Sequence, residues 1–355
     1  MDSSRDEFFM QRCLQLAQLG AGQVAPNPMV GAVLVHQDRI IGEGWHRQYG
    51  QAHAEVNCVH SVADTDKALI PQATMYVSLE PCAHHGKTPP CADLIVSECI
   101  REVVIGCKDT FSAVAGKGIE KLEKAGVQVR TGVLEAACRD INRRFFTFHE
   151  KKRPYIVLKW AQSLNGIMAT TSGAPVRISN SYSDRLVHQW RSEEMSILVG
   201  THTAVNDNPR LNNRLWTGKH PIRLVIDQTL KIPRTHHLWD GSVRTVFITA
   251  TDTTVSGLTE ILEIDFNLPV IDQLLKWLYE QNIQSVLVEG GPHVLQQFIT
   301  ADIWDEARVI TGGNLLPEGT GAPVLPAGNV ENTICLEEDR IVYYRNHAGK
   351  NMPAW

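Results

Sequence analysis

The amino-acid sequence predicts an α/β protein with two domains. Strand-like apolar runs alternate with helical patterns, the length of 355 residues suits two domains, and a charged run at 151–154 separates two halves that both show this alternation. Hydrophobic residues make up 43% of the chain, which is ordinary for packed folds, so each half can bury its own core. We therefore expect one domain at 1–150 and a second at 151–355.

The N-terminal half predicts a three-layer α/β domain. Its first helix begins at a capping box, Ser4 with Glu7, and ends at Gly20. The elements expected after it are a strand at 30–35, a hairpin return at 39–44, a helix at 54–62, a strand at 73–79, a helix at 90–100, a strand at 103–106, and helices at 118–125 and 134–150. Such alternation is typical of a sheet with helices on both faces.

The C-terminal half restarts the pattern after Pro154. The expected elements are a strand at 155–159, a helix at 181–192, strands at 195–200, 222–227 and 245–249, a helix at 274–281, a strand at 285–288 and a helix after the turn 289–292. The strand runs are apolar throughout, which is typical of a sheet covered on both faces. This half is therefore expected to be a second α/β domain.

Composition excludes several classes of partner. The formal net charge of −5 argues against general nucleic-acid binding, which usually requires a basic face. The N-terminus lacks the apolar core of a signal peptide and no apolar run approaches the ~20 residues of a membrane span. We expect a cytoplasmic homo-oligomer with no nucleic-acid or membrane partner. The eight cysteines are too few for a disulfide scaffold, so metal binding is the expected use of a paired subset.

His53, Cys82 and Cys91 form a zinc-ligand pattern, and Glu55 lies two residues after the histidine. One imidazole and two thiolates leave a fourth position on zinc for water. Zinc lowers the pKa of such a water toward ~7, which gives a nucleophile strong enough to displace an amino group from a heteroaromatic ring. Glu55 is expected to carry protons from the water to the ring nitrogen and the departing ammonia.

The local sequence places these residues at the ends of elements. Cys82 follows the strand at 73–79, and Cys91 follows Pro90, a residue favoured in the first turn of a helix, where thiolate is favoured over thiol. A His-x-Glu pair or a Pro-Cys pair alone would not indicate a metal; their combination does. Eight residues separate the cysteines instead of the two of nucleobase deaminases, which predicts a substrate other than a plain nucleoside.

Three further stretches suggest anion binding. A Gly-Lys-Thr loop containing Lys87 and Thr88 is a plausible phosphate site, although exposed loops of this kind are ordinary. Gly290 and Gly291 lie at a strand-to-helix turn, where backbone N–H groups can receive a phosphate, although a tight turn alone also explains them. The segment that runs from Thr203 through Asp207 to Arg214 is expected at the surface, where such charges are usually only solvated.

The N-terminal motifs closely resemble the deaminase half of the bifunctional deaminase and reductase family of riboflavin biosynthesis. The resemblance is carried by residues 26–31, by His53-Ala54-Glu55 and by residues 80–91. It implies a substrate that is a diaminopyrimidinone with a phosphoribosylamino group. It further implies that Asn27 lines the base pocket and that Lys87 and Thr88 hold the phosphate.

The C-terminal half resembles the reductase half of the same family at residues 159–166, 203–214 and 288–291. The resemblance implies a fold like that of dihydrofolate reductase and NADPH as cofactor. The implied dinucleotide contacts are Ala161, Thr203, Asp207 and Gly290, to which the turn adds Gly291; the implied sugar-phosphate contacts are Arg191, Leu211, Arg214 and Glu289. Lys159 is our candidate polar partner of the reacting sugar. The family often has other residues at Arg177 and Gln228, so neither is placed in the site.

Two other interpretations stay open at this point. The chain could be a zinc deaminase of another nucleobase with a degenerate second half, which would not oxidise NADPH with the deaminated intermediate. It could also be a binding protein that zinc only stabilises. The free carboxylate expected at Glu55 argues against the latter, because a structural zinc site has four protein ligands.

Overall fold

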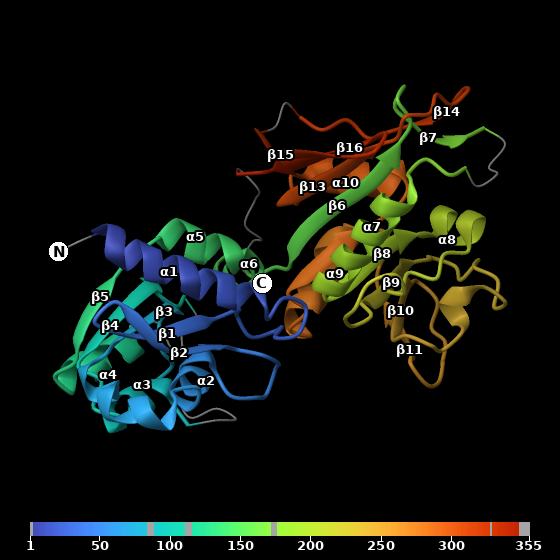
Figure 1. Cartoon of the computed structure of the whole chain (residues 1–355). Helices are drawn as coiled ribbons and strands as arrows, with labels where there is room; N and C mark the ends of the chain where they lie inside the picture. Colours follow the sequence, from blue (N-terminus) through green and yellow to red (C-terminus); the bar gives the residue numbers. More distant parts are fainter. Residues whose placement is uncertain (1–2, 84–88, 111–115, 172–175, 327–328, 348–355) are drawn as a thin grey trace. The chain divides into compact units, whose positions relative to one another are not determined.

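The computed structural model describes residues 3–83, 89–110, 116–171, 176–326 and 329–347. The chain divides into two compact units, Met1–Glu150 and Lys151–Trp355 (Figure 1). No helix in the described part of the chain combines the length and apolar character needed to cross a bilayer.

The first unit contains a five-stranded sheet in the order β2-β1-β3-β4-β5. Its strands are β1 (Gly31–His36), β2 (Arg39–Trp45), β3 (Thr74–Leu79), β4 (Glu102–Cys107) and β5 (Gln128–Thr131). Its helices are α1 (Ser3–Gln18), α2 (Ala54–His60), the 3₁₀ helix η1 (Asp64–Gln72), α3 (Cys91–Ser97), α4 (Lys117–Lys124), α5 (Glu135–Ile141) and α6 (Arg143–Lys151). β3 runs antiparallel to β1 and parallel to β4.

Helices cover both faces of this sheet. Ala32 and Leu34 of β1 pack in a core with α2, α3 and α4, whereas Val33 and Val35 point to the other face and pack with α1, α5 and α6. Figure 1 shows α1 and α5 on one side of the strands and α2, α3 and α4 on the other. The alternation of side chains along a strand thus produces the expected three layers.

The single helix expected at 134–150 is wrong, because the chain breaks it at Asn142 between α5 and α6. Asn142 is buried, and its Oδ1 accepts from the Met29 N–H at 2.7 Å while its Nδ2 donates to the Met29 carbonyl at 2.8 Å. At Asn142 the backbone leaves α-helical geometry, with φ −104° and ψ 22°. The two side-chain hydrogen bonds to Met29 hold the segment that follows Asn27.

The second unit contains a nine-stranded sheet in the order β11-β10-β9-β8-β12-β6-β13-β16-β15. Its strands are β6 (Tyr155–Gln162), β8 (Ser196–Gly200), β9 (Ile222–Ile226), β10 (Thr245–Thr249), β11 (Thr259–Glu263), β12 (Ser285–Val288), β13 (Glu306–Thr311), β15 (Asn329–Leu336) and β16 (Asp339–Arg345). A separate pair joins β7 (Ile167–Thr170) to β14 (Gly319–Gly321). The helices are α7 (Ser181–Glu193), α8 (Thr201–Asp207), the 3₁₀ turn η2 (His237–Trp239), α9 (Val270–Glu280) and α10 (Pro292–Ala301).

Both faces of the larger sheet are buried. Ile156 and Leu158 of β6 pack with α9 and α10, while Tyr155 and Val157 pack on the opposite face with α7 and α8. Strands β11, β10, β9, β8, β12, β6 and β13 run parallel to their neighbours in this order. Their carboxyl ends therefore line one edge, which is where open α/β sheets usually bind ligands.

Several elements of the second unit were not predicted from the sequence. The segment from Thr203 to Asp207 was expected only as surface chain but belongs to α8, and β11, β13, β15 and β16 were missed. β15 lies at the edge of the sheet, and among its residues 330–336 only Ile334 and Leu336 are half-buried while the others are exposed, so its apolar pattern is weak. The register of β13 against β6 and β16 supplies the pairing that local sequence does not reveal.

Candidate active sites

The three predicted metal ligands meet at one point of the first unit. Their ligand atoms all lie within 4.8 Å of one another. Cys82 follows β3, Cys91 is the first residue of α3, and His53 is the N-cap of α2 with an extended backbone at φ −72° and ψ 171°. Because His53 stands outside the helix, it need not diverge from Glu55 by the ~200° that two residues inside a helix would.

The spacing of these atoms fits zinc. His53 Nδ1 lies 3.6 Å from Cys82 Sγ and 3.4 Å from Cys91 Sγ. Tetrahedral zinc, with Zn–S near 2.3 Å and Zn–N near 2.0 Å, separates such nitrogen and sulfur atoms by about 3.5 Å. Hydrogen bonds from Cys91 and His53 lower the pKa of Cys82, and the first N–H of α3 donates to its sulfur at 3.3 Å. These contacts favour the thiolate form of Cys82, the form that binds metal.

Glu55 lies beside this cluster and is 3% exposed. Burial and the neighbouring Cys82 thiolate raise the pKa of its carboxyl group. A buried carboxyl with a raised pKa can both accept and return a proton near neutral pH. The position and the electrostatics of Glu55 suit a proton carrier for the metal site.

Asn27 is oriented by His46, a residue that the sequence analysis did not identify. His46 is 2% exposed, and its ring lies 5.2 Å from that of His53 at an interplanar angle of 75°. Its Nδ1 contacts the Ala52 carbonyl at 3.1 Å and therefore carries the proton. Burial lowers the pKa of His46, so Nε2 accepts from Asn27 Nδ2 at 3.2 Å. This leaves the Asn27 carbonyl oxygen available to a ligand.

Glu80 connects the strand that carries Cys82 to the start of α4. It is 4% exposed, and its Oε2 accepts from the N–H groups of Asp109 and Gly116 while its Oε1 accepts from those of Gly118 and Ile119. A Cβ on Gly118 would lie 1.9 Å from the Pro81 carbonyl oxygen, so only glycine fits there. The residues directly before Cys82 are thus held in place by α4 and the segment that leads to it. Lys87 and Thr88 lie outside the described residues.

In the second unit, Glu289 is the centre of a charged cluster just after β12. Arg191 binds it with two hydrogen bonds of 2.8 and 2.9 Å, and Lys159 Nζ lies 3.4 Å from its Oε2. The three side chains are 8%, 12% and 13% exposed, respectively. Burial alone would raise the pKa of Glu289, but Arg191 and Lys159 hold it at about 2. The cluster joins β6, α7 and β12.

The turn after β12 comes close to α8. A Cβ on Gly291 would lie 3.2 Å from Thr203 Oγ1, and one on Gly290 would lie 2.9 Å from the Val294 side chain. α8 begins after β8 and α10 begins after β12, and these two strands are parallel neighbours. The first backbone N–H groups of α8 and of α10 therefore lie at the same edge of the sheet, and the glycines at 290 and 291 leave space there for a ligand. This arrangement fits the phosphates of a dinucleotide.

The other residues expected in the reductase site lie around this edge. Ala161 is near the carboxyl end of β6, and Asp207 is the last residue of α8, about 9 Å along the helix from its start. Leu211 has a buried side chain and a φ of 45°, so a ligand would meet its backbone. Arg214 is exposed, and its Nη1 donates to Asn212 Oδ1 at 3.3 Å.

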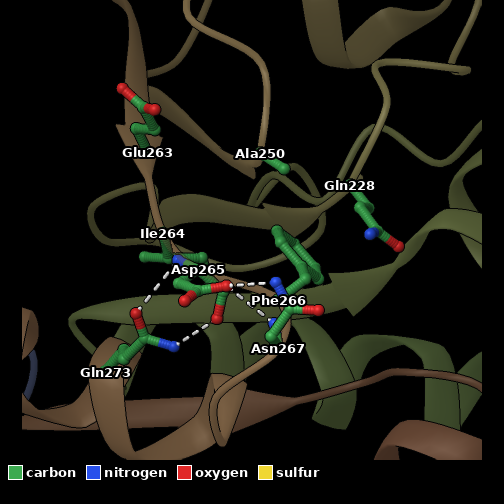
Figure 2. Close-up of a pocket in the computed structure, with 8 residues that line it drawn as sticks. All are labelled: Gln228, Ala250, Glu263, Ile264, Asp265, Phe266, Asn267 and Gln273. Carbon is green, nitrogen blue, oxygen red and sulfur yellow. Dashed lines mark hydrogen bonds between the residues drawn. The ribbon is translucent and has the colours of Figure 1, made fainter.

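A pocket of about 510 Å³ lies beyond the carboxyl ends of β9, β10 and β11 (Figure 2). Figure 2 shows Asp265 hydrogen-bonded to Asn267 and Gln273, with Gln228 and Ala250 on the other side. None of the described residues that line the pocket is Lys, Arg or His. Gln228, which the sequence analysis left out of the site, lines this pocket. The pocket lies at the same edge of the sheet as Gly290.

His188 is a second histidine that the sequence analysis missed. It is 3% exposed, and its Nδ1 accepts from the Arg214 N–H at 3.0 Å. A signal was present, because His188 precedes Arg191 by three residues on an expected helix and so shares its face. No comparable spacing pointed to His46, whose partners lie 19 and 6 residues away along the chain.

Comparisons with known proteins cover both units. Residues 3–107 match the family model described as the cytidine and deoxycytidylate deaminase zinc-binding region, and residues 154–342 match the RibD C-terminal domain. The riboflavin biosynthesis protein RibD of Aquifex aeolicus is 34% identical over 96% of this chain and 99% of its own length. That of Bacillus amyloliquefaciens is 39% identical over 88% of this chain and 87% of its own.

A solved structure has the same fold over nearly the whole chain. It is the diaminohydroxyphosphoribosylaminopyrimidine deaminase/5-amino-6-(5-phosphoribosylamino)uracil reductase of Thermotoga maritima, which is 34% identical with a TM-score of 0.89 over 97% of this chain and 99% of that one. The similarity to these proteins covers both units of the chain, including the zinc-ligand cluster of the first unit and the glycine turn of the second. The chain belongs to the RibD family of bifunctional riboflavin-biosynthesis enzymes.

Proposed function

We propose that residues 1–150 carry the deaminase reaction of this enzyme and residues 151–355 carry its reductase reaction. The protein is a zinc-dependent pyrimidine deaminase and an NADPH-dependent reductase of riboflavin biosynthesis. The observation that carries the division is the placement of the His53, Cys82 and Cys91 cluster in one compact unit and of the Glu289 cluster in the other.

In the deaminase site, His53, Cys82 and Cys91 would hold zinc. Zinc, when bound, supplies an activated water that attacks the ring carbon bearing the amino group. Glu55 would take a proton from that water and pass it to the ring nitrogen, and would then carry the remaining proton, from the hydroxyl group now on the ring carbon, to the amino group, which leaves as ammonia. Asn27, with its amide turned by His46, offers its carbonyl oxygen to an N–H of the pyrimidinone ring.

In the reductase site, the glycine turn at Gly290 and Gly291, with Ala161, Thr203 and Asp207, would hold NADPH, which supplies the hydride. Arg191, Leu211, Arg214 and Glu289 would hold the ribose phosphate. Lys159 lies on β6 beside Glu289, where its ammonium can donate to the sugar oxygen that gains a proton as the ring opens.

The protein would act in the cytoplasm as a homo-oligomer on small phosphorylated pyrimidines, without nucleic acid. A thiolate-rich metal site suits a reducing compartment. Leu164 and Leu315 support assembly: they are 63% and 70% exposed, and the Leu164 N–H donates to Asn314 beside Leu315. Sedimentation velocity would detect assembly, and a concentration-independent monomer would contradict it.

Product analysis tests the proposed function. The protein is incubated with the diaminopyrimidinone ribosylamine phosphate, first without and then with NADPH. We expect the deaminated uracil alone in the first case, and the ribityl product with matching NADPH oxidation in the second. The Cys82→Ser, Cys91→Ser double variant should lose stoichiometric zinc and deamination but still reduce added deaminated intermediate. Retention of full zinc by this variant would show that other residues hold the metal.

A further inference from the structure

The turn that carries Arg214 is attached to α7 by two side chains from one helical face. His188 and Arg191 lie three residues apart on this helix. His188 Nδ1 accepts from the Arg214 N–H at 3.0 Å, and Arg191 Nη1 donates to the Asn212 carbonyl at 3.4 Å. Arg191 also binds Glu289. The helix therefore sets the turn at a fixed distance from the carboxyl end of β12.

A second imidazole holds the preceding residue of the same turn. His220 Nδ1 accepts from the Asn213 N–H at 3.2 Å, so two successive backbone donors, those of Asn213 and Arg214, each end on a histidine nitrogen. Residues 211–214 belong to no helix or strand. Backbone groups in such a segment need partners from elsewhere, and here side chains supply them.

His188 is suited to act as a permanent acceptor. An imidazole nitrogen accepts a hydrogen bond only when it carries no proton. Burial, together with the positive charges of Arg191 and Arg214, lowers the pKa of His188 to about 4, while Glu289 acts in the opposite direction. The ring therefore stays neutral at physiological pH, and its bond to the Arg214 backbone persists.

We propose that His188, with His220 in support, is a positioning residue that aims Arg214 at the phosphate of the reductase substrate. This inference rests on the proposed role of Arg214. Arg214 is exposed and its described side-chain hydrogen bond is to an uncharged asparagine, so the direction of its guanidinium depends on its backbone. No catalytic step is assigned to either histidine.

A pair of matched variants tests the proposal. In His188→Asn the side-chain Oδ1 stands close to the place of Nδ1 and can still accept, whereas His188→Leu has a similar size and no acceptor. Steady-state kinetics with the deaminated intermediate should give a KM raised about 5- to 10-fold in His188→Leu, the loss of one hydrogen bond. The kcat and the KM for NADPH should stay nearly unchanged, and His188→Asn should resemble the wild type.

Two measurements show that the effect concerns phosphate. Ribose 5-phosphate should inhibit His188→Leu more weakly than the wild type by a similar factor, while ribose should show no difference. Deamination and thermal unfolding are recorded for each variant as folding controls. If His188→Leu does not fold, His220→Leu and His220→Asn repeat the comparison, since His220 is exposed and its replacement leaves the core intact.

The failures are distinguishable. An unchanged KM in His188→Leu, beside a raised KM in Arg214→Ala, would overturn the positioning role and leave the proposed function in place. An unchanged KM in Arg214→Ala itself would overturn the assignment of Arg214 to the phosphate and with it the positioning role, while product analysis would still test the proposed function separately. An equal rise of KM in His188→Asn and His188→Leu would show that the imidazole does not act through its acceptor.

Discussion

At the scale of single residues, both sites rely on neutral histidines that orient another side chain. His46 turns the amide of Asn27, and His188 fixes the backbone of Arg214. In each case burial lowers the pKa of the imidazole, so one ring nitrogen remains an acceptor. Neither residue was predicted from the sequence. His46 leaves no local pattern, because its partners lie 19 and 6 residues away, whereas the three-residue spacing of His188 and Arg191 on an expected helix was a signal that the sequence analysis missed.

Glu55→Gln should keep its zinc and lose deamination by a factor of about 10² to 10⁴, since an amide cannot carry the proton. Metal analysis and ammonia release measure the two effects. The reductase reaction of the same preparation, supplied with deaminated intermediate, is the internal control. A variant that still deaminates at the wild-type rate would assign the proton transfers to another group.

His188 should also make stability depend on pH. Its pKa is about 4 in the folded protein and near 6.5 in an unfolded chain. The unfolded chain therefore binds more protons between these values, so His188 lowers the free energy of unfolding as pH falls from about 6.5 toward 4. Urea unfolding at pH 7 and pH 5 should show a smaller loss in His188→Asn than in the wild type. Equal losses would contradict a depressed pKa.

At the scale of elements, Glu80 substitutes for a local helix cap. The N-cap of α4 is Gly116, which has no side chain. Glu80, which directly follows β3, accepts hydrogen bonds from the N–H groups of Gly116, Gly118 and Ile119 instead. A negative charge at a helix start also interacts favourably with the helix dipole. The same carboxylate binds Asp109 at the beginning of the loop.

Glu80→Gln should lower the free energy of unfolding of the first unit by about 1.5 to 3 kcal/mol, because an amide replaces a charged acceptor and its NH₂ faces backbone donors. Urea unfolding followed by near-ultraviolet circular dichroism measures this. Glu120→Gln, on the exposed face of α4, is the matched control and should change little. Equal effects of the two substitutions would contradict the capping role of Glu80.

Local sequence patterns predicted helices and strands well where apolar residues recurred with a clear period. They predicted poorly where an element depends on pairing with a distant part of the chain. The strand at 73–79 was predicted from a strand-like apolar run and the helix at 90–100 from Pro90, and the structure has β3 and α3 at these places, beside the cluster of His53, Cys82 and Cys91. By contrast, β13 and β16 owe their place to partners far along the chain. The break at Asn142 was missed because its partner, Met29, lies 113 residues away.

At the scale of the whole molecule, the two proposed sites occupy the same kind of structural position, at the carboxyl ends of parallel strands. Cys82 follows β3 beside its parallel neighbour β4, and Glu289 follows β12 beside its parallel neighbours β6 and β8. Carboxyl ends of parallel strands gather loops and helix starts from several parts of the chain at one edge. The sequence could therefore indicate candidate site residues, whereas the order of the strands in each sheet determines which of these residues lie close together.

The two reactions should fail independently. Arg214→Ala should weaken substrate binding in the reductase by about 1.5 to 3 kcal/mol, the value of a charge-assisted hydrogen bond, and leave deamination unchanged. Glu55→Gln should do the reverse. The kcat and KM of each reaction, measured separately on each variant, check this. Equal impairment of both reactions by Arg214→Ala, at unchanged stability, would contradict the division into two sites.

The hydrogen bonds between Asn142 and Met29 have a consequence for how the protein is made. A ribosome delivers the segment around Met29 early and Asn142 more than a hundred residues later. Contacts that close such long loops form late and slow the folding of a domain. The backbone of Met29, next to Asn27, therefore lacks its hydrogen bonds to Asn142 while most of the first unit is synthesised. A ribosome stalled just short of Asn142 would hold a nascent chain in which His53, Cys82 and Cys91 have already been synthesised, while the segment beside Asn27 still lacks its hydrogen bonds to Asn142.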